Sequence, residues 1–178
     1  IRKIVISTGV VTTVAGSTTS GSANGTGTAA SFNGPTGVTT DGTNLYVTED
    51  ANHMIRKIVI STGVVTTVAG STDNGSTNGT GTTASFYKPT GITTDGTNLF
   101  VAEENNHMIR KIVISTGVVT TLAGSTTSGS ANGTGTAASF NYPVGLTNDG
   151  TNLYIGDLAN NMIRKIVIST GVVTTLAG

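Results

Sequence analysis

The stretch EDANHMIRKI, residues 49–58, brings two carboxylates, a histidine and two basic residues together within ten positions. Glu49, Asp50 and His53 are residue types that coordinate metal ions or transfer protons in acid–base catalysis. The alternative is that they lie at the end of a strand and in the following turn, where they pair with turn amides or with Arg56 and Lys57 of a neighbouring repeat. The chain has no cysteine, which excludes thiolate metal sites and disulfides.

Internal repeats allow these two interpretations to be compared. IRKIVISTGVVTTVAG stands at 1–16 and 55–70, and it recurs at 109–124 and 163–178 with Leu122 and Leu176 in place of valine. The copies begin at residues 1, 55, 109 and 163, so the period is 54 residues. The chain is therefore three units preceded by one more copy of this segment.

The acid–histidine cluster changes from unit to unit. Its equivalents are Glu103, Glu104 and His107 in the second unit and Asp157, Leu158 and Asn161 in the third. A catalytic or metal-binding set would not need three degraded copies, and the third copy has lost the histidine and the second carboxylate. We therefore predict a structural role for the cluster, with no catalytic residue, no metal site and no cofactor.

Each unit is expected to consist of β-strands. β-Branched residues dominate 54–70, and Ser61-Thr62-Gly63 divides this run into two strands joined by a tight turn. Residues 35–49 form a second pair, joined at Asp41-Gly42-Thr43-Asn44. Residues 17–32 are rich in Ser, Thr, Gly and Asn, and we expect a loop with at most one anchored residue, Phe32. No segment has the apolar period of a helix.

Four strands in successive hairpins make a small antiparallel sheet that cannot bury both faces alone, so the units must pack face to face. Radial packing gives a β-propeller with short, protected edges, and stacking along an axis gives an open superhelix as the alternative. We predict an all-β fold of propeller blades with four antiparallel strands each: three complete blades and an extra N-terminal strand pair. The expected divisions are 1–16 for the pair of a partial blade, then a loop plus a blade in each of 17–70, 71–124 and 125–178.

The pattern resembles the NHL repeat. In the first unit the matching residues are Phe32, Pro35, Gly37, Asp41, Asn44, Leu45, Tyr46, Val47, Glu49, Asn52, His53, Ile55, Arg56, Lys57 and Ile58. The chain departs from the family pattern at Met54, Met108 and Met162, where arginine is common, at Glu49 and Glu103, where aspartate is usual, and at Asn161, where histidine is expected. The resemblance implies a propeller, commonly of six blades, on which several unrelated functions occur, so it says little about activity.

The extra strand pair implies self-association. It has no partner pair of its own, so the chain is expected to complete a ring or a polymer with further blades, from other copies or from a longer array of the same repeats. The segment predicted to make this contact is Ile1, Arg2, Lys3, Ile4, Val5 and Ile6.

Other motifs that suggest ligands are better explained without them. GTGTAA at 25–30 matches a dinucleotide fingerprint, but it lacks the strand and helix that the motif needs, and its glycines suit a loop with positive φ. The turns at Asp41, Asp95 and Asp149 offer too few oxygen ligands for calcium.

Nucleic acid and membrane are excluded as partners. The basic pairs are Arg2/Lys3, Arg56/Lys57, Arg110/Lys111 and Arg164/Lys165. Neighbours on a strand point to opposite faces, few aromatics lie nearby to stack bases, and nine basic residues balance nine acidic ones. We expect these to be strand-edge charges that answer the acidic turns. No apolar run approaches the length of a membrane span.

Composition favours an extracellular or cell-surface setting. Charged residues make up only 10% of the chain, and hydroxyl-bearing and amide side chains must dress the surface instead. N-x-S/T patterns mark Asn24, Asn74, Asn78 and Asn132 as candidate glycosylation sites in the loops.

We interpret the chain as a non-enzymatic extracellular structural or adhesive module, as the subunit of a surface filament or a fragment of a longer array. The alternative is a multivalent propeller that binds glycans or peptides, and in that case Tyr46, Phe100 and Tyr154 would be exposed; we expect them to be buried. The third reading is an NHL-like metal-dependent lyase. It is disfavoured because only His53 and His107 exist, so one chain cannot supply a three-histidine site.

Overall fold

Strands and their connections account for nearly the whole chain. A computed structural model describes all 178 residues, Ile1–Gly178. Its helical content is four single-turn 3₁₀ segments: η1 (Gly27–Ala29), η2 (Gly81–Thr83), η3 (Gly135–Ala137) and η4 (Leu158–Asn160). None of the helical segments could span a membrane.

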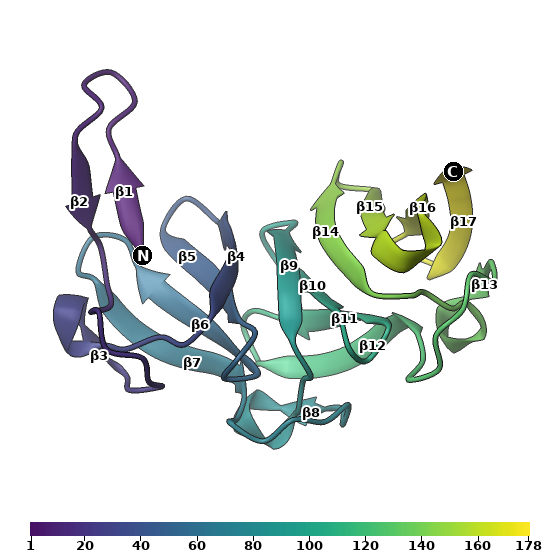
Figure 1. Cartoon of the computed structure of the whole chain (residues 1–178), viewed down its shortest axis with the longest axis horizontal. Coiled ribbons are helices and arrows are strands. Elements are labelled where there is room, and N and C mark those ends of the chain that lie inside the picture. Colours follow the sequence, from purple (N-terminus) through teal and green to yellow (C-terminus); the bar gives the residue numbers. More distant parts are fainter.

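Three repeated sheets contain most of the strands (Figure 1). Blade 1 has the order β3-β7-β6-β5-β4, blade 2 the order β8-β12-β11-β10-β9, and blade 3 the order β13-β17-β16-β15-β14. In blade 1 the strands are β3 (Gly25–Thr26), β4 (Pro35–Thr40), β5 (Asn44–Glu49), β6 (Met54–Val59) and β7 (Val64–Gly70). In blade 2 they are β8 (Gly79–Thr80), β9 (Pro89–Thr94), β10 (Asn98–Glu103), β11 (Met108–Val113) and β12 (Val118–Gly124). In blade 3 they are β13 (Gly133–Thr134), β14 (Pro143–Asn148), β15 (Asn152–Asp157), β16 (Met162–Val167) and β17 (Val172–Ala177).

The predicted fold class is confirmed: the chain is all-β, and its blades consist of four long antiparallel strands in successive hairpins. The Ser/Thr/Gly-rich segments are more structured than the sequence suggests. Each contributes a two-residue strand to the outer edge of its blade and one 3₁₀ turn, and residues 17–32 bury Ala30 as well as Phe32. The expectation of a single anchored residue was therefore wrong, because the backbone of these segments pairs with β7, β12 and β17.

Strand register decides which side chains share a face. In blade 1, Tyr46 lies opposite Lys57 and Val47 lies opposite Arg56. Because successive side chains on a strand alternate between faces, Arg56 and Lys57 point to opposite sides of the sheet. Arg56 is fully buried, whereas Lys57 is half-buried.

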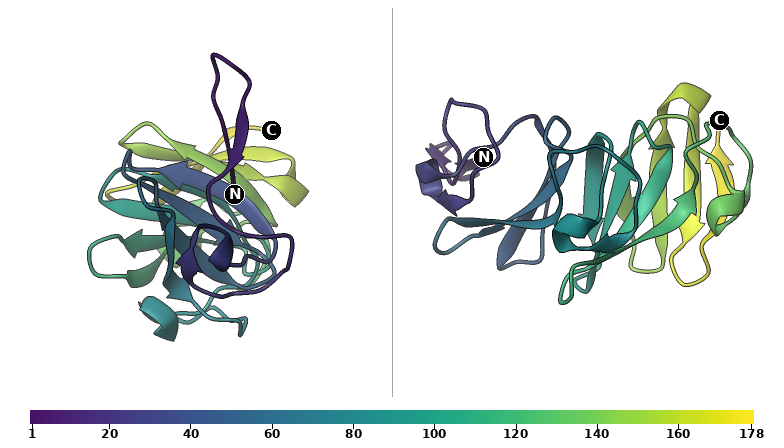
Figure 2. Two further views of the ribbon diagram at one scale, coloured as in Figure 1. Left: turned by 90° about the vertical axis from the view of Figure 1, so that its left-hand side faces the viewer. Right: turned by 90° about the horizontal axis from the view of Figure 1, so that it is seen from below.

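The blades form an arc with their first strands innermost. β9 contacts both β4 and β14, so these three strands line the concave side (Figure 1). This contact depends on glycine. A side chain at Gly37 would meet the carbonyl oxygen of Thr90 in the next blade, and one at Gly91 would meet that of Val144. The two ends of the chain lie at opposite ends of the arc (Figure 2).

The hydrophobic core lies between blades rather than within them. Tyr46, Ile55 and Ala69 of blade 1 form one cluster with seven buried residues that lead into or belong to blade 2, namely Ala84, Phe86, Ile92, Leu99, Val101, Ile112 and Val119. The equivalent residues of blades 2 and 3 form a second cluster, which includes Phe100, Ile109, Phe140 and Leu153. Tyr46 and Phe100 are buried as predicted. Tyr154 is only half-buried, so the expectation of burial was wrong there: among residues 1–178 no blade packs on its side of blade 3.

The N-terminal copy of the repeated segment folds differently from the others. β1 (Arg2–Ile4) and β2 (Val11–Thr13) form a separate two-stranded sheet, which we call the N-terminal hairpin, residues 1–16 (Figures 1 and 2). All residues of both strands are exposed. Its base rests on blade 1, where Ile1, Val14 and Ala15 pack against a cluster that includes Phe32 and Val47.

Candidate functional site

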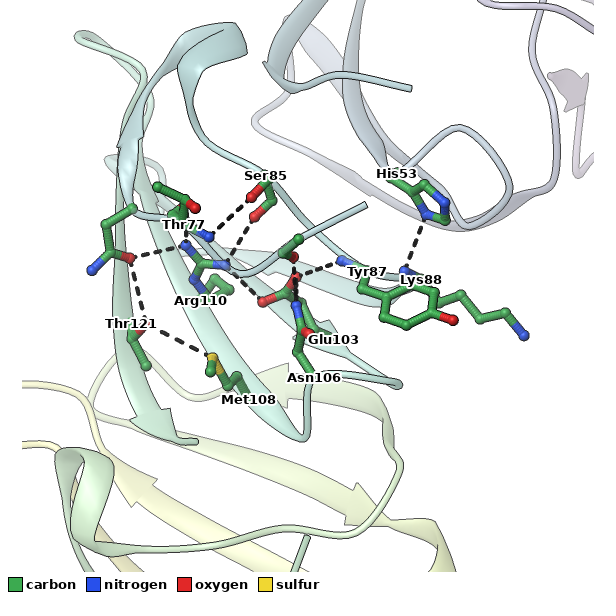
Figure 3. Close-up of polar contacts among 12 residues, drawn as sticks. His53, Thr77, Ser85, Tyr87, Lys88, Glu103, Asn106, Met108, Arg110 and Thr121 are labelled. Carbon is green, nitrogen blue, oxygen red and sulfur yellow. Dashed lines mark hydrogen bonds and ion pairs between the residues drawn. The ribbon is translucent and has the colours of Figure 1, made fainter. Parts of the chain in front are cut away.

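The acidic and basic residues of the opening motif meet inside each blade, beneath the segment that leads into it. In blade 2, Glu103 ends β10 and Arg110 lies on β11, and both side chains are fully buried (Figure 3). Arg110 Nη1 lies 2.8 Å from Glu103 Oε2. The other oxygen, Oε1, accepts hydrogen bonds from Asn106 Nδ2 at 3.0 Å and from the N–H of Tyr87 at 2.9 Å.

The two Nη atoms of Arg110 also donate to the Ser/Thr/Gly-rich segment (Figure 3). Nη1 donates to the carbonyl of Ser85 at 3.2 Å, and Nη2 donates to the carbonyl of Thr77 at 3.1 Å and to Asn78 Oδ1 at 2.9 Å. The guanidinium also stacks over the ring of Phe86, 5.2 Å from its centroid. Arg110 Nε is buried without an acceptor. The cluster therefore anchors the segment that covers the outer part of the blade.

Burial and the surrounding donors act in opposite directions on the acid. Burial raises the pKa of the Glu103 carboxyl, and the positive charge of Arg110 and the hydrogen bonds from Arg110, Tyr87 and Asn106 oppose that rise. A charge at this depth is stable only when it is paired and hydrogen-bonded, which is the arrangement found here.

The same cluster occurs in the other two blades. Glu49 pairs with Arg56 at 2.8 Å in blade 1, and Asp157 pairs with Arg164 at 2.9 Å in blade 3. Asn52 and Asn160 donate to these carboxylates as Asn106 does. The predicted structural role of the acidic position is thus supported by an ion pair that the third unit also retains.

Two expectations about these residues were wrong. The arginine that pairs with each acid belongs to the same blade, not to a neighbouring repeat, because β5 and β6 are adjacent strands and Val47 lies opposite Arg56. The arginines are also not strand-edge charges, since Arg56, Arg110 and Arg164 are fully buried. Asp50, Glu104 and Leu158 lie outside the cluster, and the carboxylates of Asp50 and Glu104 form no ion pair.

The histidines belong to the junction between blades. His53, His107 and Asn161 occupy the left-handed position of the same turn, with φ of 58°, 56° and 56°. Nδ1 of His53 accepts a hydrogen bond from the N–H of Lys88 at 3.3 Å (Figure 3), and Nδ1 of His107 accepts one from Tyr142 at 3.2 Å. Burial lowers the pKa of both histidines. Asparagine suits this position because it tolerates positive φ.

The aspartates of the DG turns use their oxygens within the turn. Asp149 Oδ1 accepts from the N–H of Thr151 at 2.8 Å and of Asn152 at 2.7 Å, and Oδ2 accepts from the hydroxyl of Tyr154 at 2.8 Å. The backbone donors of Asn152 and Thr151 and the Tyr154 hydroxyl lower the pKa of Asp149. Gly150 follows with φ of 87°. These oxygens close a hairpin, as predicted for Asp41, Asp95 and Asp149.

The candidate glycosylation sites include residues that sequence reasoning did not connect to the acid cluster. Oδ1 of Asn24 accepts a hydrogen bond from Arg56 Nη2, and Oδ1 of Asn132 accepts one from Arg164 Nη2, as Asn78 does from Arg110. The signal that could have revealed this role is the recurrence of the asparagine at a fixed distance, 32 residues, before each arginine. Glycosylation of Asn24, Asn74, Asn78 and Asn132 stays a prediction.

The structure contains no group of three or more His, Cys, Asp or Glu side chains that could hold a metal ion. One hollow lies on the side of blade 3 that faces away from blade 2, and it is lined by Val144, Gly156, Asp157, Leu158, Asn161, Met162, Ile163, Ala177 and Gly178. The equivalent sides of blades 1 and 2 are covered by the following blade.

Comparison with known proteins identifies relatives of the repeat. No family model matches the chain. NHL repeat-containing protein 2 of Homo sapiens is 36% identical over 107 residues, or 57% of this chain, and the Gallus gallus protein is 33% identical over 92 residues, or 51%. The aligned regions are 15% and 12% of those relatives' lengths.

Solved structures share the fold. A Bacteroides thetaiotaomicron protein of unknown function is 24% identical with a TM-score of 0.73, and 92% of this chain aligns with 41% of it. An auxiliary nutrient binding protein of Bacteroides ovatus is 21% identical with a TM-score of 0.70, covering 98% of this chain and 42% of that one. Virginiamycin B lyase of Staphylococcus aureus is 18% identical with a TM-score of 0.58, covering 99% and 48%. At these identities the likeness concerns the fold alone. The repeat resembles that of the NHL repeat-containing relatives, and the repeated blade has the fold of a β-propeller.

Proposed function

We propose that the chain is a non-enzymatic structural or adhesive module that works by packing its blades against other blades. The observation that carries this proposal is the position of the reactive side chains: in all three blades the acid and the arginine pair with each other and are fully buried within their own blade. The repeats present nearly identical packing faces instead. Such faces suit repeated protein–protein contacts, whereas a catalytic site needs one unique arrangement.

An extracellular or cell-surface location is part of the proposal. The chain carries 10% charged residues and no cysteine. Asn24, Asn78 and Asn132 are exposed, and although Oδ1 of each binds an arginine, Nδ2, the atom that carries an N-linked glycan, makes no hydrogen bond within the chain. Surface biotinylation of intact source cells should label the protein. Labelling only after cell lysis would contradict this location.

Self-association is the testable core of the proposal. Light scattering coupled to size exclusion should show association that increases with protein concentration, and electron microscopy should show its form. A contact that propagates gives a filament, and closed rings alone would exclude the filament. A chain that stays monomeric at every concentration would refute self-association.

Multivalent binding of glycans or peptides is the second candidate. It is favoured by the fold shared with an auxiliary nutrient binding protein and by Tyr142, which is 42% exposed and packs edge-on against His107 at 5.0 Å between ring centroids. A glycan array and a peptide library would test it. Signal that disappears in Tyr142→Ala would support this candidate, and an empty array and library would count against it.

A lyase activity is not part of the proposal, although the fold is shared with virginiamycin B lyase. His53 and His107 each accept a backbone hydrogen bond at a different blade junction. Lyase activity that requires added zinc and disappears in the double variant His53→Ala, His107→Ala would overturn this judgement.

A further inference from the structure

Two of the three blades carry a bulky side chain at a backbone position that suits glycine. Lys88 and Tyr142 have φ of 51° and 55°, and Gly34 holds the same position in blade 1 with φ of 64°. Left-handed backbone costs free energy in a residue that has a side chain, and such outliers cluster at functional sites. Both side chains are exposed. Burial therefore does not offset the cost, and a contact outside the chain is the remaining reason for these residues.

These residues lie on one edge of the arc, where neighbouring blades meet. Lys88 donates its N–H to Nδ1 of His53 in the preceding blade and accepts the N–H of Glu104 in its own blade. The turn that begins at Glu104 ends at His107, whose Nδ1 accepts the N–H of Tyr142 in the following blade. We call this connected row the junction rim and define it by Asp50, His53, Tyr87, Lys88, Glu104, His107 and Tyr142.

The repeats vary along the junction rim, whereas the outer strands of the blades are nearly constant. Residues 54–70 and 108–124 differ at one position only. Two positions of the rim differ in every blade, and they are occupied by Gly34, Lys88 and Tyr142 and by Asp50, Glu104 and Leu158. A constant scaffold with variable residues in the loops of one edge is typical of a binding surface.

Each junction also places a tyrosine ring edge-on against a histidine. The ring centroids of Tyr87 and His53 lie 5.6 Å apart at the first junction (Figure 3), and those of Tyr142 and His107 lie 5.0 Å apart at the second. Both pairs have an angle of 85° between the ring planes. The tyrosines occupy different positions of the repeat, because Tyr87 precedes the position that Lys88 and Tyr142 share. The same pair is therefore formed in two ways and is not a mere consequence of sequence repetition.

The histidines offer a fixed hydrogen-bond donor beside these rings. Because Nδ1 of each histidine accepts a backbone N–H, the neutral ring carries its proton on Nε2. Nε2 makes no hydrogen bond within the chain and is open to solvent, since the buried side-chain atoms without a partner are all arginine Nε atoms. Each junction thus presents an aromatic ring and an N–H group that points to no acceptor in the chain.

The charges and the shape of the junction rim favour a neutral sugar. Asp50, Lys88 and Glu104 form no ion pair, and their mixed signs do not suit a polyanion such as nucleic acid. No member of the rim lines a hollow of the structure, so an apolar peptide side chain finds no pocket to fill. A sugar ring needs none, because its C–H face packs on an exposed aromatic ring while its hydroxyls donate and accept hydrogen bonds.

We propose that the junction rim binds a neutral oligosaccharide, with the tyrosine of each junction packing against a sugar ring and the histidine Nε2–H donating to a sugar oxygen. The two junctions are two subsites one blade apart, and weak contacts at each add up on a ligand that reaches both. This inference rests on the second candidate function and names its ligand class and its contact residues.

Substitution by glycine separates binding from stability. An array of immobilised neutral oligosaccharides of glucose, xylose, mannose and galactose selects the probe, and titration calorimetry with that oligosaccharide measures its affinity. Tyr142→Gly relieves the left-handed backbone and removes the ring, so the melting temperature should not fall while the affinity falls by about fivefold or more. Tyr142→Phe keeps the ring and should keep the affinity within about twofold. Ser115→Ala, exposed at the other end of β11 from His107, should change neither quantity.

The outcomes distinguish the site from the function. Oligosaccharide affinity that survives both Tyr142→Gly and Tyr87→Ala would overturn the junction rim as the site and leave the second candidate standing. A melting temperature that falls in Tyr142→Gly with unchanged affinity would show that the tyrosine is structural and overturn the inference. Binding of peptides but of no oligosaccharide would overturn the ligand class. No binding by the parent protein would refute the inference and the second candidate, whereas self-association is measured separately by light scattering and would stand.

Discussion

Removal of the buried arginine in the middle blade tests whether the acid–arginine cluster holds the fold together. Arg110→Met keeps an unbranched side chain of similar length but deletes four hydrogen bonds, to Glu103, Asn78 and the carbonyls of Ser85 and Thr77. Glu103, at 0% exposure, then remains as an uncompensated buried charge.

The expected loss follows from that unpaired carboxylate. Breaking a buried ion pair by removing one partner costs about 3–5 kcal/mol, which is a large share of the roughly 5–15 kcal/mol that stabilises a typical domain. The free energy of unfolding, measured by urea denaturation, should fall by this amount. Hydrogen exchange should show lost protection first in residues 74–86, because Arg110 binds three groups of that segment.

Matched variants isolate the cause. Lys111→Met alters the neighbouring side chain, which points to the opposite face, and should change the free energy of unfolding by less than about 0.5 kcal/mol. The double variant Glu103→Leu, Arg110→Met removes both charges and should be more stable than Arg110→Met alone, because no unpaired charge remains. A loss below about 1 kcal/mol in Arg110→Met, or a double variant that is less stable than the single one, would refute this reasoning.

Three further predictions concern the junctions between blades. Burial lowers the pKa of His53 and His107 below 6.5, so the folded protein favours the neutral rings and loses stability as the pH falls below that value. The melting temperature should therefore drop between about pH 7.5 and pH 5.5, and it should drop by less in the variant His53→Asn, His107→Asn. An equal drop in both proteins would contradict the role given to the histidines. Gly91→Ala forces a side chain against the carbonyl of Val144 and should lower the free energy of unfolding by about 1–3 kcal/mol. In the control Gly145→Ala the new side chain meets nothing within 4 Å, and the free energy of unfolding of the single chain should not change. Equal losses of stability in urea denaturation would argue against the glycine contact. Phe86→Ala empties the centre of a junction and should cost about 3–5 kcal/mol, and Phe32→Ala, at the half-covered face of blade 1, should cost less when both are measured by thermal denaturation.

The structural role of much of the candidate site was predictable from the sequence, but the residues that contact one another were not. Comparison of the three units shows that His53 cannot belong to a repeated metal site, because Asn161 replaces it. The same comparison does not distinguish Asn24 from the other asparagines of the loops, because Asn24 lies 32 residues before the arginine whose guanidinium it binds. The burial of Arg56 was also out of reach: its sequence neighbours resemble an exposed strand edge, and only the segment folded over β6 removes it from water.

The sequence by itself determined the blade. A 54-residue period, β-branched runs and DG turns are local signals, and they specify strands, hairpins and the number of repeats without reference to anything distant. Only the tertiary structure decided what each copy of a repeated segment becomes. Residues 1–16 and 163–178 are almost the same peptide, yet one is an exposed hairpin and the other forms the outer strands of a blade with a buried arginine. The physical reason is that Arg164 lies beside β15, which carries the carboxylate of Asp157, whereas no strand with a carboxylate lies beside Arg2. A charged side chain is buried only where its partner is present.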